Sequence, residues 1–163
     1  MTNSPASAAP STTSDAVAQN IARARKSLGW TLLDLENALT TAGHRISLSA
    51  LSKIENRSRK VDVDDLMAIA VVLDVSPAAL LLPVGDLDEV VPVTGGRGSV
   101  GVFWEWAFGT TSLGGNTRAY QARSLPAWVG HAGLEIDSQQ NYELRFGLGE
   151  AEPHLISRSI VER

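Results

Sequence analysis

Apolar side chains recur every three or four positions through the first half of the chain, the spacing of helices that each bury one face. Loops rich in Gly, Pro and short polar residues separate these segments. Five short helices are expected, over residues 15–28, 32–42, 48–56, 63–73 and 77–82. The predicted fold is therefore mainly α, with one compact five-helix domain.

Each expected helix begins at a residue whose side-chain oxygen can accept a hydrogen bond from the backbone of the first turn. The expected N-caps are Ser14 or Asp15, Thr31 (with Asp34 completing a capping box), Ser47, Asp62 and Ser76. The third helix should bury Leu51 and Ile54. The inward residues expected in the fourth are Val63, Leu66, Ile69, Ala70 and Leu73.

Four regions follow from this pattern. Residues 1–14 are expected to be a disordered N-terminal tail, 15–83 the helical domain, 84–101 a Gly-rich linker, and 102–163 a small C-terminal region that mediates dimerisation or binds a partner. The pattern of residues 142–148 predicts a strand, and residues 155–161 fit either a strand or a final helix, so an α+β fold stays open for this region.

Charge and composition narrow the class of protein. The chain has 163 residues and a net charge of −4. Residues 15–83 are neutral, with eight basic and eight acidic residues, so a local basic face can still bind phosphate. No Cys is present, which excludes disulfides and thiol chemistry. No signal peptide or membrane-spanning segment is evident, and a cytoplasmic protein is expected.

The segment Ile46 to Asn56 reads Ile-Ser-Leu-Ser-Ala-Leu-Ser-Lys-Ile-Glu-Asn, and a basic loop follows it. Together with the apolar positions from Leu66 to Val75, it resembles the Cro/lambda-repressor-type helix-turn-helix family, also called the XRE family. The resemblance covers residues 17–82, and the stretch is similar to that of actinobacterial or actinobacteriophage regulators.

This resemblance implies a helix, residues 47–56, that reads double-stranded DNA in the major groove, where small side chains let the backbone approach the bases. The implied base-reading residues are Leu48, Ser49, Ala50 and Lys53. The implied phosphate-binding residues are Thr31, Ser47, Ser52, Asn56, Arg57, Arg59 and Lys60. It also implies a structural ion pair between Arg25 and Glu55.

Two features depart from the family pattern. Leu32 stands where the family usually has a phosphate-binding Gln, which would move that contact to Thr31. The connection from Leu39 to Ile46 is also several residues longer than the short turn of the best-known members. The pattern therefore defines the bounds of the reading helix more closely than those of the turn before it.

The resemblance implies a transcriptional regulator, with repression preferred and a phage or mobile-element lysogeny repressor as one form. It is expected to act at the nucleoid as a homodimer whose paired helices read two half-sites. Two alternatives use the C-terminal region to bind a protein: an adaptor and an antitoxin. No enzyme activity, cofactor or metal is expected, since no acid-base pair is evident and His44, His131 and His154 lack metal-ligand spacing.

Overall fold

The computed structural model of the chain describes residues 12–126, 129–136 and 142–148. It divides into two compact units, Met1–Val100 and Gly101–Arg163. None of the described helices is long and apolar enough to cross a membrane.

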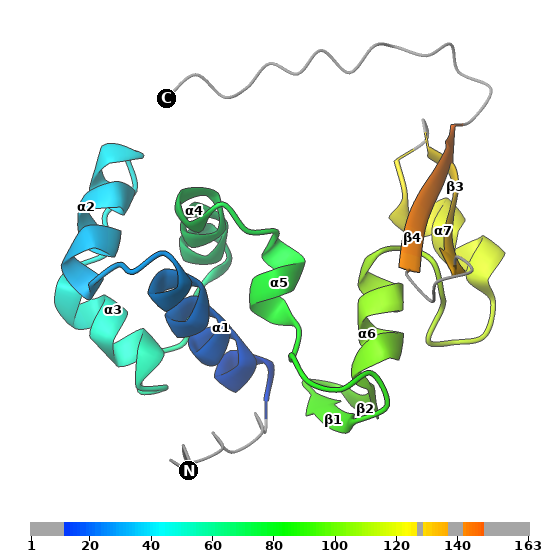
Figure 1. Ribbon diagram of the computed structural model, residues 1–163, viewed down its shortest axis with the longest axis horizontal. Coiled ribbons are helices and arrows are strands. Elements are labelled where there is room, and N and C mark those ends of the chain that lie inside the picture. The colour runs from blue at the N-terminus through cyan, green and yellow to red at the C-terminus, as the bar shows by residue number, and fades with distance from the viewer. Residues whose placement is uncertain (1–11, 127–128, 137–141, 149–163) are drawn as a thin grey trace. The chain divides into compact units, whose positions relative to one another are not determined.

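The first unit contains the five predicted helices in the predicted order (Figure 1). They are α1 (Thr13–Ser27), α2 (Leu32–Thr41), α3 (Leu48–Glu55), α4 (Val63–Leu73) and α5 (Pro77–Leu81). Together with the strands of the second unit they confirm a mainly helical chain with a small strand pair near its C-terminal end.

Side-chain caps explain where these helices begin. Thr31, Ser47, Asp62 and Ser76 each accept a backbone N–H of the first turn, as predicted. The first start is different: Thr12 is the N-cap of α1 and accepts the N–H of Asp15, so neither Ser14 nor Asp15 caps the helix. Residues 13 and 14, assigned to the tail, are therefore helical; residues 1–11 of that tail lie outside the described residues.

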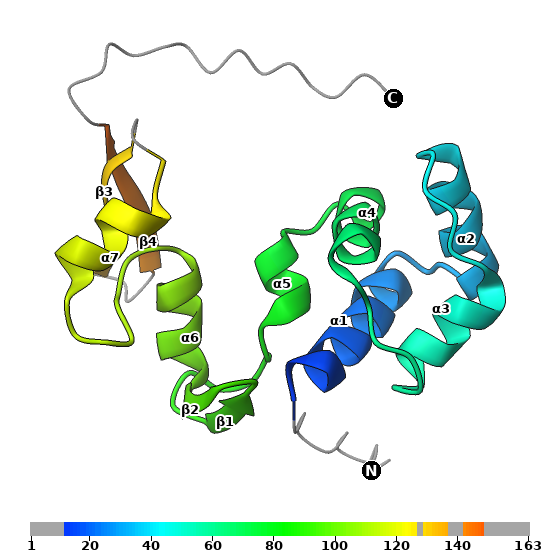
Figure 2. The same ribbon diagram turned by 180° about the vertical axis from the view of Figure 1, so that it is seen from behind.

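The five helices, drawn from two sides in Figures 1 and 2, pack around one apolar core. Its fully buried members are Ile21, Leu35, Leu39, Leu51, Ile54, Ile69 and Leu80. One predicted core position is wrong: Val63 is 77% exposed. Val63 is the first residue of α4, at an end of the helix that the core does not cover.

A buried amide ties α5 to α1. The Nδ2 group of Asn20 donates to the carbonyl oxygens of Leu80, at 3.0 Å, and Leu82, at 2.7 Å. Both carbonyls lie at the end of α5, where no further helical turn supplies donors. Asn20 thus holds the end of the helical domain against its first helix.

Residues 84–101, expected to be a linker, contain a β-hairpin instead. Strand β1 (Val90–Val93) pairs antiparallel with β2 (Gly96–Ser99), and Gly95 takes the left-handed conformation of the turn, with φ of +95°. The N–H of Thr94 donates to Oγ1 of Thr13 at 3.0 Å, and the N–H of Thr13 donates to Oγ1 of Thr94 at 3.4 Å. Val91 of β1 is buried. These contacts attach the hairpin to the start of α1.

The second unit contains α6 (Val100–Ala107), α7 (Thr117–Ser124) and an antiparallel pair of strands, β3 (Val129–Ile136) and β4 (Tyr142–Leu148). The predicted strand over 142–148 is confirmed, whereas 155–161 lie outside the described residues. The ring of Trp104 on α6 and that of Phe108, just after the helix, have centroids 5.5 Å apart and are tilted by 47°. Gln121 of α7 donates to the Gly109 carbonyl.

Substituting Asn20→Ala should destabilise the chain by about 2 kcal/mol, because it leaves two carbonyls at the end of α5 without their side-chain donor. Urea unfolding measures the change. Asn37→Ala, an exposed helical asparagine, is the matched control and should change stability by less than about 0.5 kcal/mol. Equal effects of the two variants would contradict the role of Asn20.

Candidate nucleic-acid interface

Helix α3 presents one apolar and one polar face. Leu51 and Ile54 are buried in the core. Leu48, Ser49 and Lys53 are exposed, whereas Ala50 is half-buried and packs against the core. Of the four residues implied to read bases, Leu48, Ser49 and Lys53 are therefore open to solvent. The fourth, Ala50, has a small side chain that is partly covered.

Two oxygen acceptors hold the start of α3. The Ser47 hydroxyl accepts the N–H of Ala50 at 3.3 Å, and Oε1 of Glu36 accepts the N–H of Leu48 at 2.9 Å. Glu36 belongs to α2, so this second bond joins the two helices of the motif. The sequence pattern did not identify Glu36, because nothing along the chain indicates that it faces a residue twelve positions later.

The end of α3 is held by the ion pair that the resemblance implied. Nε and Nη2 of Arg25 donate to the two carboxylate oxygens of Glu55, at 2.7 and 2.8 Å. A third guanidinium nitrogen donates to the Trp30 carbonyl. The hydrogen bond to Glu55 raises the pKa of Arg25, against the opposing effect of partial burial. This pair anchors α3 to α1.

The basic loop after α3 folds back on the helix end. Asn56 is the C-cap, and Arg57 has a positive φ of 61°, which turns the chain out of the helix. The Ser58 hydroxyl and the N–H of Arg59 both bond the carbonyl oxygen of Lys53, at 3.1 Å. Arg57 and Lys60 are exposed, and no described residue forms an ion pair with either.

Arg59 is placed differently from Arg57 and Lys60. Its Nη2 donates to Oδ2 of Asp65 at 2.9 Å, while Nε2 of His44 lies 2.8 Å from Oδ1 of the same carboxylate. Asp65 is a buried residue of α4. It therefore links the turn before α3 to the loop after it, and a phosphate contact by Arg59 would compete with this pair.

Thr31 is also engaged within the protein. Its hydroxyl and its backbone N–H both donate to Oδ2 of Asp34, at 2.7 Å, and complete the capping box of α2. These two bonds lower the pKa of Asp34, with the hydroxyl contributing most. The Thr31 hydroxyl would have to leave Asp34 before it could donate to phosphate.

Arg45 is a cation that the sequence pattern missed. It lies in the long connection before α3 and is exposed. With Thr40, Ser47, Ala50 and Arg59 it lines a polar hollow beside the start of the helix, to which Glu36 and Ile46 also contribute. Arg45 thus adds a second cation, beside Arg59 of the basic loop, to this hollow. Its position in the unusual connection explains why comparison with short-turn relatives did not indicate it.

Substituting Arg25→Met should destabilise the chain by about 3 kcal/mol, since it leaves Glu55 as a largely buried charge without a partner. Urea unfolding of Arg25→Met and Arg23→Met provides the comparison. Arg23 lies on the same helix but is exposed, so its variant should stay within about 0.5 kcal/mol of the parent. A small effect at both positions would show that the pair does not anchor α3.

The capping box predicts a pH dependence. Because the folded pKa of Asp34 is below its usual value of 3.8, its contribution to stability is complete above that pH and is lost as the pH falls through the folded pKa. Carboxyl NMR titration should give a lowered pKa in the parent, moving toward the usual value in Thr31→Val. An unchanged value in that variant would exclude the hydroxyl as its main cause.

Within the described residues, no cluster of His, Asp and Glu side chains has an arrangement that could hold a metal ion. A family model described as helix-turn-helix matches residues 21–80, from within α1 to within α5. Neither a curated protein nor a solved structure matches the chain. The match supports an XRE-like regulator, and residues 21–80 are a helix-turn-helix domain of the DNA-binding type found in Cro and lambda repressor.

Proposed function

We propose that the chain is a sequence-specific repressor of transcription that inserts α3 into the major groove of double-stranded DNA. The observation that supports this most is the outer face of α3. It is short and carries small polar side chains apart from Leu48 and Lys53, and hydrogen bonds hold both of its ends. Such a face lets a helix backbone approach base edges in a groove about 12 Å wide.

Base reading is assigned to the exposed side of α3. Lys53 can donate to O6 or N7 of guanine, and Ser49 can donate to or accept from several bases. Leu48 and Ala50 can contact a thymine methyl group. Ser49 and Lys53 lie one helical turn apart, so they can address neighbouring base pairs of one half-site.

Phosphate binding is assigned to cations and hydroxyls around α3. Arg57 and Lys60 are exposed after the helix, and Arg45 is exposed before it. The polar groups Ser47, Ser52 and Asn56 complete the set, while Thr31 and Arg59 join it only by exchanging their present carboxylate partners. This arrangement puts phosphate contacts on both sides of the reading helix, which would fix its register.

Repression follows if the bound domain covers a promoter, and two copies on a two-fold operator would supply the affinity that one short helix lacks. We propose a repressor of its own gene, as in a phage or mobile element. The protein would then act at the nucleoid.

A second candidate, an adaptor or antitoxin, is favoured by one observation in the second unit. Val102, Trp106 and Phe108 are exposed apolar side chains on or just after α6, and exposed apolar patches mark contact surfaces. Under this alternative, Trp106→Ala would abolish capture of a protein partner, whereas substitutions on α3 would leave that capture unchanged.

Fluorescence anisotropy over a salt series tests the DNA-binding proposal, with the duplex upstream of the chain's own gene and a random duplex as probes. Lys53→Ala should weaken binding to the specific duplex by about tenfold and reduce discrimination between the two probes. Arg57→Ala should weaken binding to both probes equally and reduce the salt slope by about 1.

Arg97→Ala provides the control, because Arg97 is an exposed arginine on β2, outside the helix-turn-helix domain. It should bind both probes as the parent does. Equal, weak binding of the parent to the two probes calls for selection from a random duplex library. Failure of that selection to enrich any sequence would overturn the proposal.

A further inference from the structure

Asp65 is a buried carboxylate that two basic side chains share. Its side chain is 9% exposed, with Oδ1 lying 2.8 Å from Nε2 of His44 and Oδ2 lying 2.9 Å from Nη2 of Arg59. An ionised carboxylate can only accept hydrogen bonds, so both nitrogens donate to it. A change at either basic group therefore alters how well the other must compensate the buried charge.

The bond to Asp65 also decides which nitrogen of His44 can gain a proton. Nε2 already carries the hydrogen that it donates to Oδ1, so Nδ1 is the nitrogen that takes up a proton when the ring becomes charged. The His44 side chain is 35% exposed, so solvent can supply this proton. A charged ring would keep its bond to Asp65 and add a full positive charge beside it.

Arg59 borders the surface that is proposed to bind phosphate. It lines the polar hollow beside the start of α3, and its side chain is 41% exposed. Its backbone N–H is held by the carbonyl oxygen of Lys53 at 3.1 Å. The guanidinium can therefore turn from Asp65 toward a phosphate while the backbone of the loop stays in place.

Such a turn would leave Asp65 with the His44 bond alone. A buried carboxylate without a compensating charge is costly, and a neutral imidazole offers it only one hydrogen bond. We propose that His44 takes up a proton when Arg59 exchanges Asp65 for a DNA phosphate, so that the imidazolium replaces the guanidinium as the counter-charge of Asp65. This inference rests on the proposed function, because it concerns the regulation of one of its phosphate contacts.

The elements around His44 carry further charges. Arg45 follows it in the chain and, with Glu36 of α2, lines the same hollow as Arg59. Lys60 of the basic loop is exposed. The cations Arg45 and Lys60 oppose a proton at His44 and Glu36 favours it, but the proposed exchange moves none of the three.

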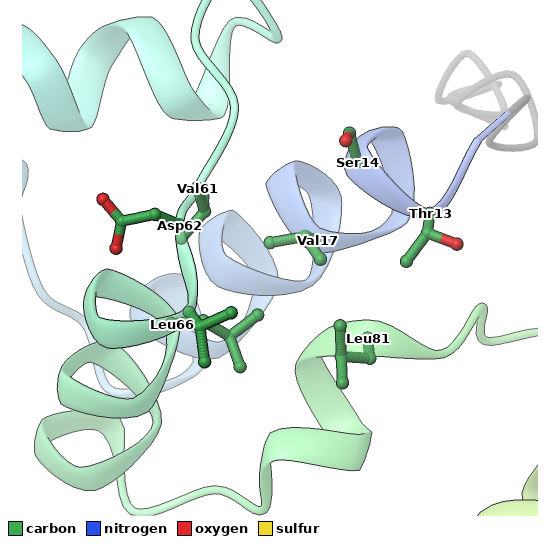
Figure 3. Close-up of a pocket in the computed structure, with 8 residues that line it drawn as sticks. Thr13, Ser14, Val17, Val61, Asp62, Leu66 and Leu81 are labelled. Carbon is green, nitrogen blue, oxygen red and sulfur yellow. The ribbon is translucent and has the colours of Figure 1, made fainter. Parts of the chain in front are cut away.

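The acidic groups at the start of α4 favour the charged ring. Asp62 accepts the N–H of Asp65 at 2.8 Å, and Figure 3 shows its carboxylate pointing away from the apolar side chains of Val17 and Leu66. Asp64, between these two acids, is exposed. When the guanidinium leaves, the local charge becomes more negative, and this change stabilises an imidazolium beside Asp65.

The exchange makes DNA binding depend on pH. Between the titration midpoint of His44 in the free protein and the higher midpoint in the complex, the complex binds more protons than the free protein does. Affinity for DNA should therefore rise as the pH falls through this range. Below the range His44 is protonated in both states, so its effect on affinity levels off.

NMR titration of the free protein tests the shared carboxylate without DNA. Arg59→Ala removes the guanidinium from Asp65, so the titration midpoint of the His44 ring should move up by about 1 pH unit. Arg57→Ala is the control, because it removes an exposed cation two residues away and should move that midpoint much less. The His44 signals are identified by their loss in His44→Gln. An unchanged midpoint in Arg59→Ala would overturn the proposal.

Fluorescence anisotropy at about pH 6 and about pH 8 tests the coupling to DNA, with the upstream and the random duplex as probes. The parent should bind several-fold more tightly at the lower pH. His44→Gln keeps a donor for Asp65 but cannot gain a charge, so it should lose this difference. His131→Gln, in β3 and outside the helix-turn-helix domain, should retain it. Circular dichroism checks that each variant is folded.

Equal pH dependence of the parent and His44→Gln would overturn the proposal and leave the proposed DNA binding standing. A phosphate contact does not depend on base sequence, so the comparison holds for the random duplex as well. A parent that binds both duplexes equally would contradict sequence-specific binding. The difference between the parent and His44→Gln on the random duplex would then still decide whether a proton is taken up.

Discussion

The ion pair between Arg25 and Glu55 is the contact on which the position of α3 depends. Leu51 and Ile54 attach the helix to the core through apolar packing, which is not directional. The guanidinium, in contrast, holds both carboxylate oxygens of Glu55 and the Trp30 carbonyl, so it fixes the end of α3 against α1. The direction of every outward side chain on α3 follows from that attachment.

Carboxylates organise the rest of the surface around α3. Glu36 holds the start of α3, Asp34 completes the capping box of α2, and Asp65 joins His44 to Arg59. The helical domain has no net charge, yet several of its acidic groups are engaged within the protein while Lys53, Arg57 and Lys60 stay exposed. Net charge alone therefore says little about whether this domain can bind DNA.

Local signals predicted most of the helical domain. Four of the five helix starts carry the predicted cap, since a cap depends on groups only two or three residues apart. The errors lie where local signals conflict with distant contacts. Gly95 and its neighbours indicated a linker, but pairing of β1 with β2 and the Thr13–Thr94 hydrogen bonds made a hairpin. Val63 fits the apolar period of α4 but lies at an end of the helix that the core does not cover.

The sequence by itself determined the number, order and type of the first five elements, because periodicity and capping act over a few positions. It also determined which of them is the candidate reading helix, α3, and which of its residues are buried. Only the tertiary structure decided which charges are free. Arg57 and Arg59 are two residues apart in one basic loop, yet Arg59 reaches the buried carboxylate of Asp65 while Arg57 remains exposed. That difference depends on how α4 packs beside the loop, and no local pattern in the chain encodes it.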